Sequence, residues 1–165
     1  HERDAVHPPT ISSWFREATP ETSAYHMEFD WTGTDDPTPW LCVPTAIDFL
    51  ASLHPDGWPG IRQRNHQLAR EGRDLICEAV GVDPPAPDQM LGTLASIPLP
   101  DRPPEAEVGP PHFDPLQKTL VENHGFEVPV FDWPGAPHRH IRISAHLYNR
   151  RDQYQRLASV LKDAI

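Results

Sequence analysis

The sequence predicts an α/β fold in which a small domain follows a piece of another domain. Three observations lead to this prediction. Apolar residues recur at helical spacing between about residues 38 and 80, and beyond residue 93 short strand-like runs alternate with helical runs. A further strand-like run, residues 6–12, has no partner strand near it in the sequence, and a lone strand cannot satisfy its own backbone groups.

Two helices are predicted in the first half of the chain. One covers about residues 38–53 and has Pro44 near its start, and a His-Pro-Asp-Gly run ends it. The other covers residues 58–80, with Gly81 as its stop. One face of this second helix is apolar. We expect its other face to be ordinary solvated surface, because that face carries Arg62, Arg64, Arg70, Glu71 and Arg73.

In the second half of the chain, the apolar pattern predicts a strand, a helix, two strands and a final helix. Asp114 should cap the first of these helices, with Pro115 in its first turn and Gly125 at its end. Asn149 should cap the final helix. The strands are expected at residues 94–99, 126–131 and 140–146, the second of them at an edge or a bulge because of Pro129. The final helix should bury Tyr154, Leu157, Ala158, Leu161 and Ile165.

The net charge and the cysteine content indicate which binding partners and which cellular compartment to expect. The formal net charge of −10 argues against nucleic acid and against an anionic membrane surface, because both bind basic faces. No apolar run approaches the length of a membrane span. Cys42 and Cys77 fall inside apolar helical patterns, so we expect two buried free thiols in the reducing cytoplasm. The sequence begins with His1 rather than Met, which is consistent with a fragment, a processed chain or a trimmed chain.

Arg142 is the most informative single residue. In the predicted strand, Ile141 and Ile143 should point to the core, and Arg142 and Ser144 should point to the other face. We expect an arginine in mid-strand to be partly desolvated and to need an anion. The anion could be a substrate carboxylate held by two hydrogen bonds, or an acidic side chain of the same protein. Spacing alone favours the second alternative.

The loop Phe29-Asp30-Trp31-Thr32-Gly33-Thr34 is a second candidate site. Gly33 and Thr34 offer a flexible backbone with N–H and hydroxyl donors, which suits a phosphate oxygen. A plain turn ahead of a helix would use the same residues.

Ten histidines raise the question of a metal site. His138 and His140 could share a strand face, but the neighbouring charge of Arg142 would repel a cation and no recognisable ligand spacing completes the set. Structural or surface roles are favoured for these histidines.

Taken together, these segments resemble the class V aminotransferases and cysteine desulfurases, and among them the isopenicillin N epimerase-like branch. Residues 29–34, FDWTGT, followed by a helix, resemble the Gly-Thr segment of this family. Residues 141–144, IRIS, and then Tyr148-Asn149, resemble its C-terminal R-x-S…YN motif. Residues 122–130, ENHGFEVPV, resemble the GIEVPV-like stretch of the epimerase-like branch. The matches follow the family's order across nearly the whole chain.

The resemblance implies the C-terminal portion of a pyridoxal-phosphate-dependent enzyme with the fold type I transferase architecture. Residues 1–55 would be the end of the large cofactor-binding domain. Residues 56–165 would form the small C-terminal α/β domain, and the helix at about 58–80 would bridge the two. Enzymes of this kind act on amino acids as homodimers, with the active site at the dimer interface.

The same resemblance assigns roles to individual residues. Gly33 and Thr34 would reach the cofactor phosphate of the partner subunit, and Arg142 would bind the substrate α-carboxylate. The lysine that binds the cofactor belongs to the large domain, and this chain has no lysine before Lys118. No catalytic residue is therefore assigned, and we expect the chain alone to be inactive without the missing N-terminal large domain.

Several readings remain open at this point. Epimerisation, transamination and C–S bond cleavage all use this scaffold; the resemblance favours epimerisation, with a lyase of the cysteine-sulfoxide-conjugate type close behind. A different class is a non-catalytic binding module that completes the site of a partner. A severed domain would expose the apolar faces of Trp40, Leu41, Ile47 and Leu50, so aggregation or obligate association is expected.

Overall fold

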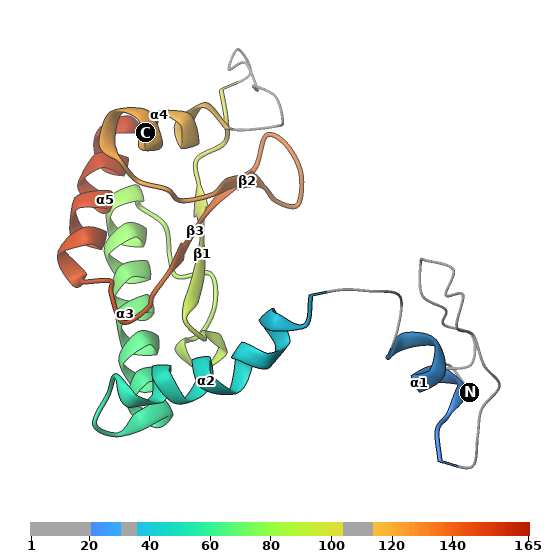
Figure 1. The fold of residues 1–165 in the computed structure, drawn as a ribbon. Coiled ribbons are helices and arrows are strands. Elements are labelled where there is room, and N and C mark those ends of the chain that lie inside the picture. Colours follow the sequence, from blue (N-terminus) through green and yellow to red (C-terminus); the bar gives the residue numbers. More distant parts are fainter. Residues whose placement is uncertain (1–20, 31–35, 104–113) are drawn as a thin grey trace. The chain divides into compact units, whose positions relative to one another are not determined.

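The computed structural model describes residues 21–30, 36–103 and 114–165 (Figure 1). The chain forms two compact units, His1–Asp48 and Phe49–Ile165, and each is described by itself. The strand expected at residues 6–12 lies outside the described residues.

The first unit contains a short helix, α1 (Ala24–Phe29), that the sequence pattern did not predict. The side-chain oxygen of Ser23 accepts a hydrogen bond of 3.3 Å from the backbone N–H of His26 and caps this helix. At six residues, α1 is too short for an apolar stripe to repeat, so periodicity could not indicate it.

The helix α2 (Thr38–Ser52) confirms the first predicted helix and contains Pro44. The boundary between the two units falls inside it. No residue of α2 is buried, and its apolar side chains are open to solvent, with Trp40 74% and Leu41 71% exposed. Ile47 is exposed as expected, whereas Leu50 is half-buried. Cys42 is exposed as well, so the expectation of two buried thiols is wrong for this residue.

The second unit is a mixed α/β domain with an antiparallel sheet. Its order of long elements is the predicted one, with a short 3-10 helix in addition. The elements are α3 (Gly57–Val80), η2 (Asp88–Met90), β1 (Leu94–Leu99), α4 (Pro115–His124), β2 (Val130–Asp132), β3 (Arg139–Ser144) and α5 (Arg151–Ala164).

The ends of α3 and α4 follow local chemistry that the sequence made visible. Gly81 ends α3 and Gly125 ends α4, each in the left-handed backbone region, with φ of 73° and 70°. Asp114 caps α4, and its carboxylate accepts a hydrogen bond of 2.9 Å from the backbone N–H of Leu116. The predicted boundaries of both helices are therefore confirmed.

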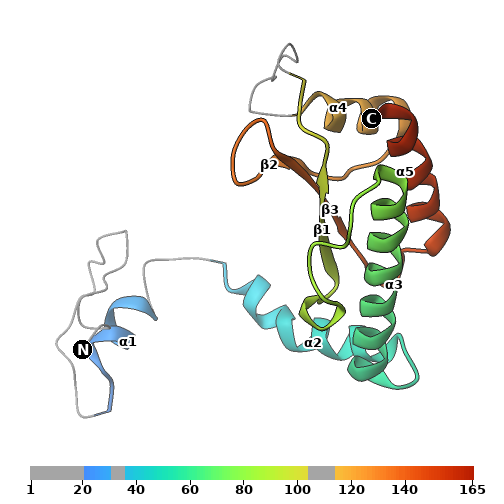
Figure 2. The same cartoon turned by 180° about the vertical axis from the view of Figure 1, so that it is seen from behind.

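The three strands form one antiparallel sheet in the order β1-β3-β2. The helices α3 and α5 lie on one face of this sheet (Figures 1 and 2). β2 is at an edge, as Pro129 indicated, but it begins only at Val130. The N–H of Val130 donates to the side-chain oxygen of Gln117 on α4 at 2.7 Å, and the carbonyl of Pro129 accepts a hydrogen bond of 3.1 Å from the N–H of Arg142 on β3.

The core lies between the sheet and the two long helices. Each large apolar side chain that it removes from water contributes on the order of 1.5–3 kcal/mol to folding. Gly72 of α3 allows close packing here, because a Cβ at this position would come within 2.9 Å of both Ile143 and Tyr154. The large apolar side chains that are most fully buried are Ile76, Ile97, Leu120, Ile141, Ile143 and Leu161.

The polar face of α3 differs from the expectation of plain solvated surface. Arg73 is 3% exposed and donates to Asp88 at 2.6 Å and to the carbonyl of Ala86 at 3.1 Å. Arg64 donates to the carbonyls of His146 and Asn149. The segment after α3 thus covers Arg73 and the segment after β3 covers Arg64, and periodicity within one helix cannot reveal such contacts.

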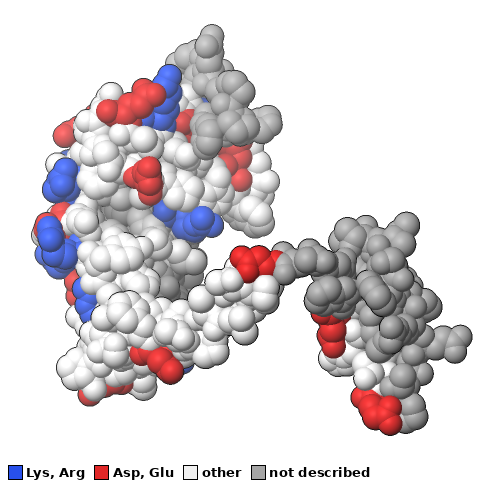
Figure 3. Space-filling model, viewed as in Figure 1, with Lys and Arg blue, Asp and Glu red and all other residues white. Residues whose placement is uncertain are grey.

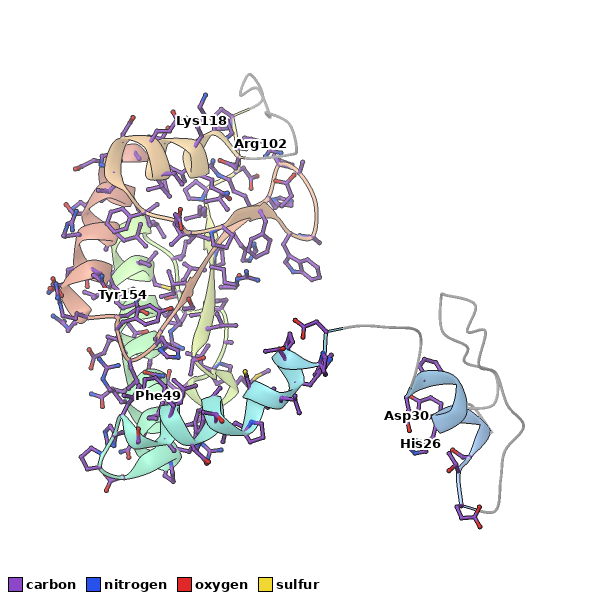
Figure 4. The ribbon with its side chains drawn as sticks, in the orientation of Figure 1. His26, Asp30, Phe49, Arg102, Lys118 and Tyr154 are labelled. Carbon is purple, nitrogen blue, oxygen red and sulfur yellow. The ribbon has the colours of Figure 1, made fainter. Side chains whose placement is uncertain are left out.

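A group of charged residues joins one end of the sheet to α4. Asp114 is 1% exposed and accepts hydrogen bonds from Arg139 at 2.9 Å and from Arg102 at 3.3 Å. Arg102 also donates to Asp132 at 3.0 Å, and Figure 4 places it at the α4 end of the unit. Burying these charges is tolerable because each of them is paired.

Two expectations for α5 need correction. Ile165 is 44% exposed, because it follows the last helical turn and so lies outside the buried stripe. Arg150, rather than Asn149, occupies the N-cap position, and its backbone N–H donates to the side chain of Gln153 at 2.9 Å. Tyr154, Leu157, Ala158 and Leu161 are buried as predicted.

Candidate functional site

The face of the sheet opposite α3 and α5 carries the polar side chains of β3. Ile141 and Ile143 are buried, whereas Arg142 and Ser144 are exposed, which confirms the predicted alternation. The expected partial desolvation of Arg142 is wrong, because no described element of its unit covers this part of the sheet. Within residues 21–30, 36–103 and 114–165 no carboxylate forms an ion pair with Arg142. The acidic partner that spacing favoured is therefore absent from the described chain.

The register of the sheet sets the neighbours of Arg142. Ser96 on β1 lies directly opposite it, and such facing pairs have Cβ atoms about 5 Å apart. His140 lies two residues earlier on the same face of β3 and pairs with Phe131 on β2. The rings of His140 and Phe131 are stacked, with centroids 6.1 Å apart. Nδ1 of His140 is buried and has no hydrogen-bond partner among the described residues.

A hollow of about 430 Å³ opens beside these residues. The sheet contributes Ser96, Phe131 and His140 to its lining, and the loop after β2 adds Trp133, which is 63% exposed. Leu91 and Arg73 line its other side. The walls are thus mainly apolar, with a few polar groups.

The charge of Arg73 at the edge of the hollow is already balanced. Burial lowers the pKa of Arg73, but hydrogen bonds to Asp88 and Asp74 outweigh burial and raise that pKa overall. The hydrogen bond from Arg73 in turn lowers the pKa of the Asp88 carboxyl. Arg73 therefore stays charged and paired, whereas Arg142, beside the hollow, has no acidic partner among the described residues.

The segment after β3 holds the Tyr-Asn pair of the predicted motif. Tyr148 is 77% exposed and its ring stacks on that of His146, with centroids 4.8 Å apart. The side-chain oxygen of Asn149 accepts a hydrogen bond of 3.0 Å from the backbone N–H of His146. Asn149 therefore closes the turn between β3 and α5, and Arg150 caps the helix that follows.

The remaining predicted site residues are distributed as follows. Gly33 and Thr34 lie outside the described residues, so their role stays a prediction. Lys118 lies on α4 and Lys162 on α5, both exposed, and neither lines the hollow.

The described residues also bear on metal sites and membrane spans. In the parts of the chain that the structure describes, no three His, Cys, Asp or Glu residues are grouped as metal ligands would be. No described helix has the length and apolar character needed to cross a bilayer.

Charge is distributed differently over the two units. In the view of Figure 3, basic and acidic side chains are interspersed on the second unit. The described part of the first unit contains no Lys or Arg, and its charged residues are acidic. A single-sign basic face is not seen in this view.

The sequence pattern could indicate some residues of the hollow but not others. Alternation along β3 was a usable signal for His140, which shares the face of Arg142, whereas Ser96 is placed on that face only by the register of β1 against β3. Trp133 and Leu91 gave no such signal, because they lie in loops that only the folded chain brings to the sheet.

The fold and the site define a small α/β module with an exposed arginine, Arg142, on the open face of its sheet. No protein-family model matches the chain. It is 32% identical to isopenicillin N epimerase of Amycolatopsis lactamdurans, over 96% of this chain and 39% of that protein. It is also 33% identical to isopenicillin N epimerase of Streptomyces clavuligerus over 78% of this chain and 30% of that protein. The L-cysteine desulfhydrase of Arabidopsis thaliana is 27% identical over 97% of this chain and 36% of that protein.

The chain is thus homologous to proteins named as epimerases and as cysteine desulfhydrases. It spans between 30% and 39% of the length of these curated relatives. Its sequence therefore corresponds to a portion of such proteins.

Proposed function

We propose that the chain is the C-terminal part of a pyridoxal-phosphate-dependent enzyme that acts on an amino acid. The observation that supports this most directly is Arg142, an exposed arginine in the central strand with no acidic partner among the described residues. The relatives are named as enzymes whose substrates are isopenicillin N and L-cysteine, and both molecules carry an α-amino acid group. The share of these relatives that the chain spans fits a small C-terminal domain.

In this function Arg142 binds the α-carboxylate of the substrate. A guanidinium can donate two parallel hydrogen bonds to a carboxylate, which fixes the orientation of the substrate as well as its position. Ser96 and Ser144 lie on the same face of the sheet and offer further hydroxyl donors. The substrate is thereby held with its Cα in one place while a proton is removed or returned.

The described residues do not hold pyridoxal phosphate by themselves. The cofactor supplies an electron sink for the bonds at the substrate Cα, and it needs a lysine beside that carbon. Lys118 and Lys162 do not line the hollow. The lysine and the acidic partner of the cofactor ring would come from the large domain, and Gly33 and Thr34 would bind the cofactor phosphate across a homodimer. The complete protein would work in the cytoplasm.

Epimerisation of an amino-acid substrate is the leading reaction, since the relatives with identities above 30% are named as epimerases. C–S bond cleavage is the alternative, supported by the desulfhydrases. The reaction products distinguish the two. An epimerase returns the substrate with its Cα configuration inverted, whereas a C–S lyase releases pyruvate, ammonia and a thiol or sulfide.

The first test is to sequence the genomic DNA upstream of the codon for His1. We expect an open frame that encodes a large domain with a lysine, and a purified full-length protein that shows the visible absorption of bound pyridoxal phosphate. A stop codon directly upstream would contradict the proposal. It would favour the remaining class of function, a non-catalytic module, and a partner that co-purifies with the chain would then be sought.

The second test concerns Arg142 in the full-length protein. Removing a charged hydrogen bond costs on the order of 1.5–3 kcal/mol, so Arg142→Ala should raise KM for the amino acid roughly 10- to 100-fold. Arg142→Lys should recover only part of this loss, because an ammonium cannot form the paired hydrogen bonds. Arg62→Ala, an exposed arginine on α3, is the matched control and should leave KM unchanged. Equal effects of Arg62→Ala and Arg142→Ala would contradict the carboxylate-binding role.

A further inference from the structure

The hollow on the open face of the sheet lies next to Arg142. Ser96, which lines it, is the cross-strand neighbour of Arg142, and His140, which also lines it, is two residues away on the same face. Its volume of about 430 Å³ falls within the range of about 300–1,000 Å³ that is usual for small-molecule sites. A cysteine side chain has only two heavy atoms and would leave most of this volume unfilled.

The walls of the hollow indicate what kind of group fits. Phe131, Trp133 and Leu91 offer two aromatic rings and an aliphatic side chain, which favour an apolar occupant. The charge of Arg73 is satisfied by its own carboxylates, so this residue does not require an anion. Nδ1 of His140 is a buried polar atom without a partner in the described chain, and a polar group on the ligand would satisfy it as donor or as acceptor.

We infer that this hollow receives the side chain of the amino-acid substrate, and that this side chain is bulky, mainly apolar and carries one polar group. The inference rests on the proposed carboxylate-binding role of Arg142. Arg142 and the hollow then hold two ends of the same molecule, the carboxylate on one side and the side chain on the other. The substrate class is therefore a large α-amino acid rather than cysteine.

Nuclear magnetic resonance of the isotopically labelled 165-residue chain tests this directly. The probes are L-alanine, L-phenylalanine and L-4-aminophenylalanine, which share the α-amino acid group and differ in side-chain bulk and polarity. Alanine should shift the signals of Arg142 and Ser144 alone. Phenylalanine should also shift Ser96 and the indole of Trp133, and should bind about tenfold more tightly because its ring is buried. The 4-amino group should strengthen binding further.

Two variants and one control assign the effect to the hollow. Trp133→Ala removes an apolar wall and should abolish the preference for phenylalanine over alanine. His140→Phe keeps the ring and removes the unpaired nitrogen, so it should abolish only the gain from the 4-amino group. Val121→Ala, an exposed residue of α4 that does not line the hollow, should change neither preference.

The possible failures are distinguishable. If alanine and phenylalanine bind with equal affinity and the signals of Ser96 and Trp133 do not move, the inference about the hollow is wrong while the role of Arg142 stands. If neither amino acid moves the Arg142 signals, the proposed carboxylate site is wrong, and the inference falls with it. If phenylalanine shifts Trp133 equally in Arg142→Ala, the hollow binds rings without the carboxylate site, which overturns the assignment to a substrate side chain.

Discussion

The guanidinium of Arg139 on β3 donates a hydrogen bond of 2.9 Å to Asp114, the residue that caps α4. Both side chains are buried, at 8% and 1% exposure. One carboxylate thus serves as the cap of a helix and as the counter-charge of the central strand. This contact fixes α4 to the sheet that carries the candidate site.

Asp114→Ala should destabilise the second unit strongly. The substitution removes a helix cap and leaves the buried charge of Arg139 without its carboxylate, and breaking a buried pair in this way costs about 3–5 kcal/mol. Urea unfolding followed by circular dichroism should show a lower midpoint. Asp101→Asn, at an exposed pair with His138, is the control and should move the midpoint little. Equal shifts for the two variants would contradict this role of Asp114.

The pair of Arg73 and Asp88 should make stability depend on pH. Its hydrogen bond lowers the pKa of Asp88 in the folded chain below the ordinary value of 3.8. A depressed pKa stabilises the fold above the unfolded-state pKa, and the stabilisation is lost as the pH falls through the folded-state pKa. The difference in unfolding free energy between wild type and Asp88→Asn should therefore be largest near neutral pH and should narrow progressively as the pH falls below about 4.

The control for this pH dependence is Asp163→Asn, an exposed carboxylate near the end of α5. Its difference from wild type should be small at every pH. A gap between wild type and Asp88→Asn that stays constant from neutral to acid pH would show that the carboxylate charge of Asp88 does not contribute.

The two cysteines should react with dithionitrobenzoate at very different rates. Cys42 on α2 is exposed, whereas Cys77 on α3 is buried, and burial raises the pKa of the Cys77 thiol. The thiolate is the reactive form, so Cys77 should react only after unfolding. Cys42→Ser should remove the fast phase of the native chain, and Cys77→Ser should retain it. A fast phase that survives in Cys42→Ser would contradict the burial of Cys77.

The exposed apolar side chains of α2 should drive association of the chain. Trp40 and Leu41 are 74% and 71% exposed, and large side chains at the centre of an interface each contribute about 2 kcal/mol or more. The double substitution to Gln should weaken self-association at least tenfold in sedimentation velocity. Met90→Gln, which removes an equally exposed side chain from η2, should have little effect. A wild-type chain that is monomeric at all concentrations would refute the prediction.

The parts of the fold that sequence predicted are those set by neighbours in the chain. Gly81 and Gly125 end helices because of their own backbone freedom, and Asp114 caps a helix through the next two residues. The alternation of Ile141, Arg142 and Ile143 follows from strand geometry alone. Such signals are local, so one sequence was sufficient to read them.

The features that sequence missed depend on contacts between distant segments. Arg73 appeared to lie on a solvated face until the loop with Ala86 and Asp88 was seen to cover it. The hollow unites Leu91, Trp133 and His140, and only the strand register and the loop paths bring these together. Arg142 was found by its position, whereas the group opposite Arg142 required the pairing of β1 with β3.

Gly72 of α3 packs against the covered face of the sheet, behind the strand that carries Arg142. A single methyl group there would press on Ile143 and on Tyr154, whose hydroxyl donates to the carbonyl of Ser144 at 2.6 Å. Ser144 is two residues from Arg142, so a Cβ at Gly72 would crowd the end of the strand that carries Arg142. A substitution at Gly72, which does not line the hollow, would therefore act on the proposed site from the covered side of the sheet.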